Sequence, residues 1–426
     1  MLRLALIVAC VLAAGPAWAH AVLLEIQPPD GSALDKGPAA IVLRFNEPVA
    51  PVAIHLLDAT GTDRASAAPR AQDNEVRLEL PELPGGGYIV SWRVVSADSH
   101  PIGGGSVFTV GGGILPGPYA PQDARREAGW TAAIMVNRLA LYAALMFAAG
   151  GTLFGFLVLR PLRVEVDGFV HWRSRAALMA MSTAILAVGL KGGQLGALMP
   201  LALLQPATWR LGLVTSMADS ALILLVGLSL MLGAGHWRRL RPWLEVTGAA
   251  VALVGLSATG HAASGPGWVQ VVAAVHALLA GFWLGAFWPL LRLIPAHPAA
   301  TLAAARRFSR LAMPAVLLLA VSGGGMALSR IPDLSQLVSA PYGQLLIVKL
   351  LIVTGLLVVA AANRWQATPA LASGQRQASA DFARNLWLEI GLGATVLLLT
   401  AVLAHTPPPG MATHDHSPGG ATERVH

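Results

Sequence analysis

Two patterns of hydrophobic and polar positions divide the chain. From residue 20 to about 110, short runs alternate apolar and polar residues, as in the run from Tyr88 to Val95. Segments rich in Gly, Pro and Asp separate these runs, for example at 28–31 and 84–87. Short alternating strands with regular turn signals predict a small all-β Greek-key sandwich, of the cupredoxin or immunoglobulin kind, over residues 20–110.

After a Gly- and Pro-rich linker at 111–131, the pattern changes to long apolar segments. Each is close to the roughly 20 residues that an α-helix needs to cross a bilayer. Eight such spans are predicted, at 132–158, 174–195, 212–233, 243–262, 268–291, 311–328, 343–363 and 385–404. Residues 132–404 are therefore predicted to form an all-α polytopic membrane domain. The tail at 405–426 contains histidines without any periodicity and is predicted to be disordered.

Composition agrees with a membrane protein. Hydrophobic residues make up 55% of the 426 residues and charged residues only 12%, about half the charged share of soluble domains. The loops predicted to face the cytoplasm hold Arg160, Arg163, Arg173, Arg175, Arg238, Arg239, Arg241, Arg292, Arg306, Arg307, Arg310, Arg364, Arg376 and Arg384. The external loops between spans hold only Arg210 and Arg330. The net charge of +7 therefore marks topology by the positive-inside rule, and no nucleic-acid partner is expected.

The N-terminus has the features of a secretory signal peptide over residues 1–19. A basic Arg3 precedes an apolar run, and Ala17-Trp18-Ala19 forms a small-residue cleavage site. Cys10, the only cysteine, lies in this peptide, so the mature chain has no thiol and no disulfide. We expect a multi-pass protein of a bacterial inner membrane, in contact with the lipid bilayer. An even number of spans places both the N-terminal domain and the C-terminal tail in the periplasm.

Cleavage after Ala19 would make His20 the first residue, with its α-amine and imidazole both available as ligands. Asp98 and His100 lie two residues apart, after the strand that ends near Val95. In an extended segment, residues two apart lie on the same side. Cu(II) prefers a square-planar or tetragonal set of nitrogen and oxygen ligands. An isolated Asp-x-His in a loop is more often solvated, but in combination with His20 it predicts a copper site.

The segments at 20–23, 29–32, 43–49 and 92–101 resemble the CopC family of periplasmic copper-binding domains. The resemblance covers the whole first domain. It implies that His20, Asp98 and His100 bind Cu(II) and that Glu47 lies near the metal without binding it. No methionine occurs between His20 and Ile134, so the domain is similar to the members that bind Cu(II) only.

Ionisable residues inside membrane spans are costly and are therefore candidates for a site or pathway. The predicted topology places a set of them in the outer halves or at the outer ends of their spans: Asp219, His261, His276, Lys349 and His405. Lys349 can alternatively extend to the interface, and Asp219 can form a structural ion pair with Lys191. Met217, Met313 and Met326 are thioethers that a Cu(I) route through the membrane domain can use, although methionine in apolar helices usually packs.

The membrane domain resembles the CopD family of polytopic inner-membrane copper proteins. The resemblance rests on the segments 275–285 and 307–312, on Ser322-Gly323, on Lys349-Leu350 and on Asn363-Arg364. A CopC–CopD fusion implies copper import or resistance, in which copper bound in the periplasm passes to or across the membrane without a catalytic step. A periplasmic copper chaperone or a reductant would be its partner.

Two other functions fit part of this pattern. An N-terminal histidine with a second histidine on a β-sandwich also describes a histidine-brace copper oxidase or monooxygenase. His261 and His276 could instead be the axial ligands of a haem in a helix bundle.

Overall fold

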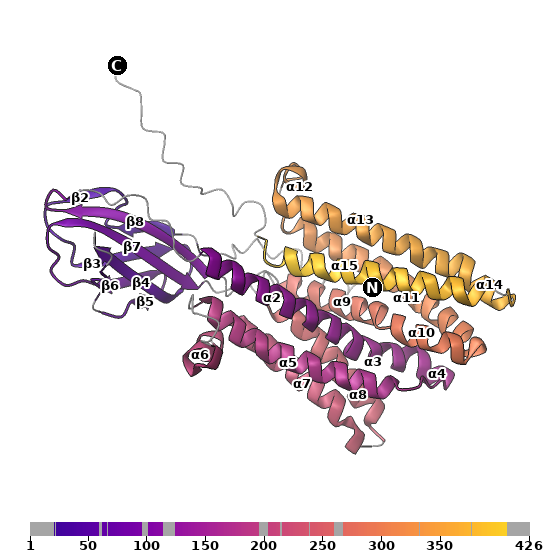
Figure 1. Ribbon diagram of the computed structural model, residues 1–426. Coiled ribbons are helices and arrows are strands. Elements are labelled where there is room, and N and C mark those ends of the chain that lie inside the picture. The colour runs from indigo at the N-terminus through magenta and orange to yellow at the C-terminus, as the bar shows by residue number, and fades with distance from the viewer. Residues whose placement is uncertain are drawn as a thin grey trace, which may run out of the picture. The chain divides into compact units, whose positions relative to one another are not determined.

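The computed structural model describes residues 21, 23–58, 62–65, 67–95, 101–113, 124–195, 203–213, 215–237, 239–259, 267–331, 333–375 and 377–406 (Figure 1). The predicted signal peptide, most of the tail and the predicted site residues His20, Asp98, His100 and His261 lie outside these ranges. Contacts between Cα atoms divide the chain into two units. The first comprises residues 1–141, 178–233 and 250–274, and the second residues 142–177, 234–249 and 275–426.

The predicted all-β domain is confirmed as two four-stranded sheets. One sheet has the order β1-β3-β6-β5, formed by β1 (Leu23–Gln27), β3 (Ala40–Phe45), β6 (Glu75–Glu79) and β5 (Arg70–Gln72). The other has the order β2-β8-β7-β4, formed by β2 (Ser32–Leu34), β8 (Pro101–Val110), β7 (Gly86–Val95) and β4 (Ala50–Asp58).

The core of this domain follows from the alternation of β7. Every second side chain of that strand, Tyr88, Val90, Trp92 and Val94, is buried in the core. The Trp92 ring meets Phe45 of the other sheet edge to face, with ring centroids 5.6 Å apart. Gly104 lies opposite Trp92 in β8, and a Cβ there would lie 2.5 Å from the indole. Glycine at this position therefore makes room for the ring.

The second part of the chain is helical. The first helix runs through α2 (Ala124–Leu145), the π-helical segment η1 (Met146–Gly150), α3 (Gly151–Phe154), the π-helical segment η2 (Gly155–Leu159) and α4 (Arg160–Leu162). It is followed by α5 (Phe169–Leu195), α6 (Pro206–Leu213), α7 (Ser216–Gly233), η4 (Ala234–His236), α8 (Arg241–Val254) and η5 (Gly255–Ala258). The remaining helices are α9 (Gly267–Leu284), α10 (Phe287–Ala296), α11 (Pro298–Leu328), α12 (Gln336–Ser339), α13 (Pro341–Ala362), η7 (Asn363–Ala367), α14 (Thr368–Ala372) and α15 (Ala378–Leu403).

Helix α2 begins at Ala124, inside the segment predicted as linker up to residue 131. The residues Ala124 to Glu127 favour helix but include three charged side chains. A search for apolar spans therefore starts later than the helix itself.

Seven helical segments among the described residues are long and apolar enough to cross a membrane, rather than the eight predicted. The difference is the predicted span at 243–262, where α8 has 14 residues and continues as the 3-10 helix η5. Near the start of α8, Glu245 pairs with Arg173 of α5 at 3.1 Å. At its end, the carbonyl of Gly255 accepts a hydrogen bond of 2.7 Å from Ser220, in the first turns of α7. The segment thus runs antiparallel to α7, as a spanning segment would.

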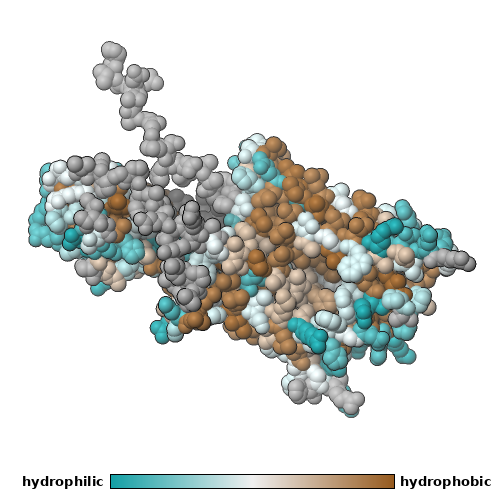
Figure 2. Space-filling model, in the orientation of Figure 1, coloured by the Kyte–Doolittle hydropathy of each residue, from teal (hydrophilic) through white to brown (hydrophobic). Residues whose placement is uncertain are grey.

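The surfaces of the helices agree with their assignment as membrane-spanning segments. Brown, hydrophobic side chains cover most of the visible helical surface in Figure 2, whereas teal predominates on the β-sandwich. Exposed large apolar residues of the helices include Leu222, Val226, Leu317, Val321, Leu351 and Val358. Side chains of this kind are suited to lipid rather than water. The chain is a multi-pass membrane protein with an all-β domain before its helices.

Candidate functional site

The register of the two sheets brings three parts of the chain to one end of the sandwich. Leu23 at the start of β1 pairs with Phe45 at the end of β3. In the other sheet, Ala50 at the start of β4 pairs with Val95 at the end of β7, and Val95 also pairs with Pro101. Because only residues 46–49 connect Phe45 to Ala50, these ends of both sheets lie together. The residues preceding β1, the β3–β4 connection and the β7–β8 connection therefore all start or finish at this end.

Two described residues help to define this end. Ala21, which follows the predicted ligand His20, is buried in the sandwich core. Glu47 lies in the β3–β4 connection, and its carboxylate oxygen Oε1 is buried. The predicted ligands His20, Asp98 and His100 lie outside the described residues. Within the described residues, no group of three or more His, Cys, Asp and Glu side chains could hold a metal ion.

His55 does not belong to this end of the sandwich. It pairs in register with Ser91 in the middle of β4 and is exposed. Its Nδ1 lies 2.7 Å from Asp63 Oδ2. Partial burial acts to raise the pKa of Asp63, but the hydrogen bonds from His55 and from the backbone of Ala65 and Leu56 hold that pKa below its ordinary value. His55 therefore pairs with Asp63 on the surface of the domain, away from the end of the sandwich where the strand ends meet.

In the second unit, His276 of α9 contacts Ser322 of α11, with 2.9 Å between Nδ1 and Oγ. The Ser322 hydroxyl donates its single proton to the carbonyl of Leu319 at 3.1 Å. In the tautomer that accompanies this hydrogen bond, Nδ1 of His276 carries the proton and Nε2 the lone pair. A Cβ at Gly323 would lie 3.4 Å from the imidazole Cε1, so this ring packs directly against the backbone of α11.

One basic side chain lies near this histidine, and a second lies near the first. Lys349 of α13 interacts electrostatically with His276 and with Arg330, which follows α11. The Arg330 guanidinium in turn donates a hydrogen bond of 3.3 Å to the hydroxyl of Tyr342, near the start of α13. Tyr342 packs in one apolar cluster with Leu403, at the end of α15. The structure thus brings together His276 and Lys349, two of the residues predicted for a pathway.

The other predicted pathway residues have contacts of their own. His405 follows α15, and its Nδ1 lies 3.1 Å from the carbonyl of Ala401. Asp219 lies in the first turn of α7, which belongs to the first unit. Lys191, the predicted ion-pair partner of Asp219, donates a hydrogen bond of 3.2 Å to Gln194. His261 lies outside the described residues.

Sequence reasoning missed a polar cluster at the other end of the second unit. Glu389 of α15 is only 3% exposed, and its Oε1 accepts a hydrogen bond of 3.0 Å from the Asn363 amide of η7. Glu245, the carboxylate of α8, pairs with Arg173 and Arg241, whereas Glu389 pairs with an amide. A carboxylate inside an apolar span was the available signal.

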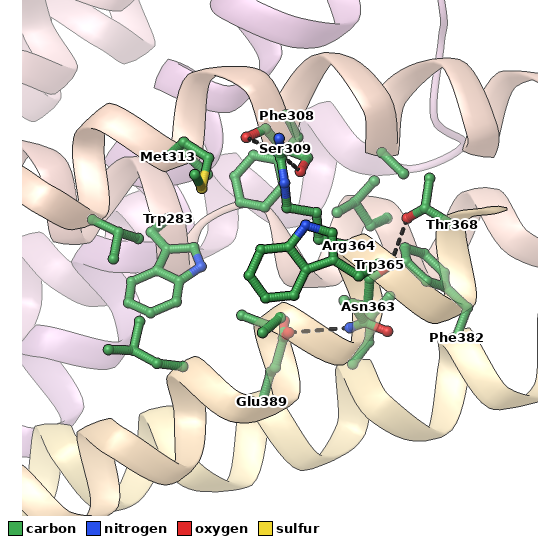
Figure 3. A pocket seen from close by; sticks show the side chains of 18 residues that line it. Trp283, Phe308, Ser309, Met313, Asn363, Arg364, Trp365, Thr368, Phe382 and Glu389 are labelled. Atoms are coloured by element: carbon green, nitrogen blue, oxygen red, sulfur yellow. Dashed lines mark hydrogen bonds between the residues drawn. The ribbon is translucent and has the colours of Figure 1, made fainter.

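This cluster lines a cavity of about 200 Å³ (Figure 3). Its walls are mostly apolar and include Trp283, Phe308 and Met313. Arg364, next to Asn363, points away from Glu389 and donates to the backbone carbonyl and hydroxyl of Ser309. The cavity therefore has polar groups in two separate places, the Arg364 guanidinium beside Ser309 and the Glu389 carboxyl group beside Asn363.

Three family models match the chain. The CopC domain matches residues 23–111, the N-terminal domain of copper resistance protein D-like proteins matches 128–271, and copper resistance protein D matches 302–403. The copper transport protein CutJ of Bacillus subtilis is 27% identical over 92% of this chain and 75% of its own length. Copper resistance protein C of Xanthomonas campestris pv. juglandis is 34% identical over 24% of this chain and 89% of its own length.

Among solved structures, the crystal structure of CopC from Methylosinus trichosporium OB3b is 31% identical, with a TM-score of 0.20, and the match covers 24% of this chain and 99% of that one. The residues matched by the three family models follow the boundary between the sandwich and the helices. The matches confirm the predicted family for both parts. The chain belongs to the CopC/CopD copper resistance and transport family, as a fusion of a CopC domain with a CopD membrane domain.

Proposed function

We propose that this protein binds Cu(II) in the periplasm and passes copper to or across the inner membrane. The ligands are the α-amine and imidazole of His20, the carboxylate of Asp98 and the imidazole of His100. The observation that carries the proposal is the convergence of strand ends on one end of the sandwich. The start of β1, Glu47 and the two ends of the β7–β8 connection meet there.

The ligand set favours Cu(II) over other ions. It consists of nitrogen and oxygen donors, which suit a tetragonal Cu(II) site, whereas Cu(I) prefers thiolates and thioethers. The CopC domain has no methionine or cysteine after the signal peptide. Glu47, with one buried carboxylate oxygen near this end, is suited to orient a ligand by a hydrogen bond rather than to bind the metal itself.

His276 is the best-prepared acceptor among the described residues of the membrane domain. Its hydrogen bond to Ser322 leaves Nε2 as the free donor atom, in the way that supporting hydrogen bonds orient metal-binding histidines. The nearby charges of Lys349 and Arg330 oppose a bound cation. A weakened site of this kind suits a step through which copper passes, rather than one in which it is stored.

We place the CopC domain and the C-terminal tail on the periplasmic side of the inner membrane. The signal peptide exports the N-terminus, and the arginine-rich loops remain in the cytoplasm. An even number of crossings requires the segment α8 with η5 to span, which its antiparallel run beside α7 supports.

Two measurements test the binding and the transport claims separately. Electron paramagnetic resonance of the purified full-length protein with one equivalent of Cu(II) should show a tetragonal signal with nitrogen hyperfine coupling. Cells that lack the protein should accumulate less cytoplasmic copper than cells that produce it. A Cu(II) signal identical to that of free copper contradicts the binding claim, and unchanged accumulation contradicts import.

Replacing Ser322 with alanine tests His276 as an acceptor. The variant removes the hydrogen bond that fixes the imidazole, and we expect copper uptake into proteoliposomes to fall about 10- to 100-fold. Ser329→Ala is the matched control, because Ser329, directly after α11, likewise donates to a carbonyl three residues earlier. We expect uptake by Ser329→Ala to match the original protein. Equal uptake by both variants would exclude His276 as a step of the route.

A further inference from the structure

We propose that Glu389 is a proton-binding site inside the membrane domain and that it exchanges a proton with water as copper moves, so that copper transport is linked to protons. This inference rests on the proposed copper transport. The sequence motifs and the family matches assign no role to this residue. The inference begins from a carboxylate that is buried between helices and lines a cavity.

Amide and hydroxyl groups hold Glu389 in place. The Asn363 side chain donates to Glu389 Oε1 at 3.0 Å, and its own oxygen accepts from Asn385 at 3.0 Å. The Thr368 hydroxyl donates to the backbone carbonyl of Asn363 at 2.7 Å. That carbonyl belongs to the π-helical segment η7, where the ordinary helical hydrogen bonding is interrupted. The chain thus uses three side chains, one each from α15, η7 and α14, to position one carboxyl group.

The charged residues of the elements around Glu389 have other partners. On α10, Arg292 lies over the ring of Trp288, with 5.8 Å between guanidinium and ring centroid. On η7, Arg364 donates to Ser309. On α15 itself, Asp381 pairs with Arg384 at 3.0 Å.

The other elements around the cavity add no ion pair to Glu389 among the described residues. On α11, Arg307 donates to the carbonyl of Leu157, and Arg306 and Arg310 are not among the residues that line the cavity. Lys349 of α13 interacts electrostatically with His276, and α14 has no ionisable side chain. Among the described residues, no cation forms an ion pair with Glu389. An unpaired ionised carboxylate is very unfavourable in a buried site, so Glu389 holds a proton in this arrangement.

The cavity provides a route by which that proton can leave. Glu389 lines it together with Trp283, Phe308 and Met313, and its volume of about 200 Å³ accommodates several water molecules. Met313 and Trp365 at its edge are 52% and 67% exposed, so the cavity opens to the outside of the helices. Figure 3 shows the carboxyl group of Glu389 and the amide of Asn363 on the same side of this space. Deprotonation transfers the proton to this water and leaves the carboxylate hydrogen-bonded to Asn363.

A purely structural role makes a different prediction from a proton site. If Glu389 only connects α15 to η7, then Glu389→Gln should behave like the original protein, because glutamine offers the same carbonyl acceptor to Asn363. If Glu389 binds a proton, the same variant keeps its fold but loses the titrating group. Asp381→Asn is the matched control, since it removes a carboxylate from the same helix at an exposed ion pair.

The test uses the full-length protein in proteoliposomes that contain a pH-sensitive dye. We expect copper uptake by the original protein and by Asp381→Asn to be accompanied by a pH change inside the vesicles. We expect this change to be lost in Glu389→Gln, together with the pH dependence of its copper uptake. Copper uptake by Glu389→Gln with an undiminished pH change overturns the proposal.

Infrared spectroscopy of the same samples separates this proposal from the proposed transport function. A protonated carboxyl group has a carbonyl stretching band that an ionised carboxylate and an amide lack. We expect this band in the original protein and in Asp381→Asn, and its loss in Glu389→Gln. If the original protein moves no copper, the transport function fails, while the band still decides whether Glu389 holds a proton. Identical spectra for Glu389→Gln and the original protein overturn the proton site.

Discussion

A chain with one additional residue before His20 is expected to lose its high-affinity binding of Cu(II). The additional residue turns the α-amine of His20 into an amide, so that the chelate of amine and imidazole can no longer form. Loss of even a supporting hydrogen bond costs a metal site about 10- to 100-fold in affinity, so loss of a ligand should cost about 100-fold or more. Titration calorimetry of the purified full-length protein, with its N-terminus verified by mass spectrometry, measures this change.

The other ligands provide independent tests of the same site. His100→Ala and Asp98→Asn should each weaken Cu(II) binding as strongly as the extension, and Glu47→Gln should weaken it about tenfold. His55→Ala is the control, because His55 lies in the middle of β4, is exposed and contacts Asp63. Unchanged affinity in the extended chain would exclude the α-amine as a ligand. An affinity loss in His55→Ala as large as in His100→Ala would place the copper elsewhere on the domain.

The architecture of the β-sandwich could be predicted because its strands are half buried. The alternation in β7, where Tyr88, Trp92 and Val94 face the core, has the period of a strand with one buried face. The ligands that we propose for copper were inferred from the signal peptide, the Asp-x-His pair and the family resemblance. That the neighbouring strand ends meet at one end of the sandwich follows from the register, such as the pairing of Ala50 with Val95, which alternation within single strands does not specify.

The membrane domain shows where sequence patterns lose information. Hydropathy locates apolar segments, but it cannot show that α8 ends early and continues as the 3-10 helix η5. Hydropathy also gives no information on contacts between residues that are distant in the sequence. The partner of Glu389 is Asn363 rather than a nearby arginine, and the partner of His276 is Ser322, 46 residues away. Both pairs depend on how the helices pack against one another. Side-chain shape determines this packing, whereas the spacing of apolar residues along a helix does not.

A close contact between two helical segments of the second unit also depends on how the helices pack. Gly150, at the end of the π-helical segment η1, lies against Gly281 of α9, and Gly285, the residue directly after α9, lies against the backbone of Gly150. Two glycines four residues apart are a known means of bringing membrane helices into backbone contact. A Cβ at Gly150 would overlap the carbonyl oxygen of Gly281. Backbone atoms cannot rotate away as a flexible side chain can, so this crossing tolerates glycine only.

Gly150→Ala is therefore expected to decrease the free energy of unfolding of the membrane domain by about 3 kcal/mol or more, at the upper end of overpacking effects. Thermal unfolding of the full-length protein in detergent, followed by tryptophan fluorescence, measures the change. Gly324→Ala in α11 is the matched control, since a Cβ there meets no atom within 4 Å. Removing a glycine from a helix should stabilise that variant by up to about 1 kcal/mol. Equal unfolding temperatures of the two variants would contradict the close crossing at Gly150.

The same variant should separate copper binding from copper uptake. Gly150 and the sandwich belong to different units. We therefore expect Gly150→Ala to bind Cu(II) at the sandwich as the original protein does, and to lose copper uptake into proteoliposomes.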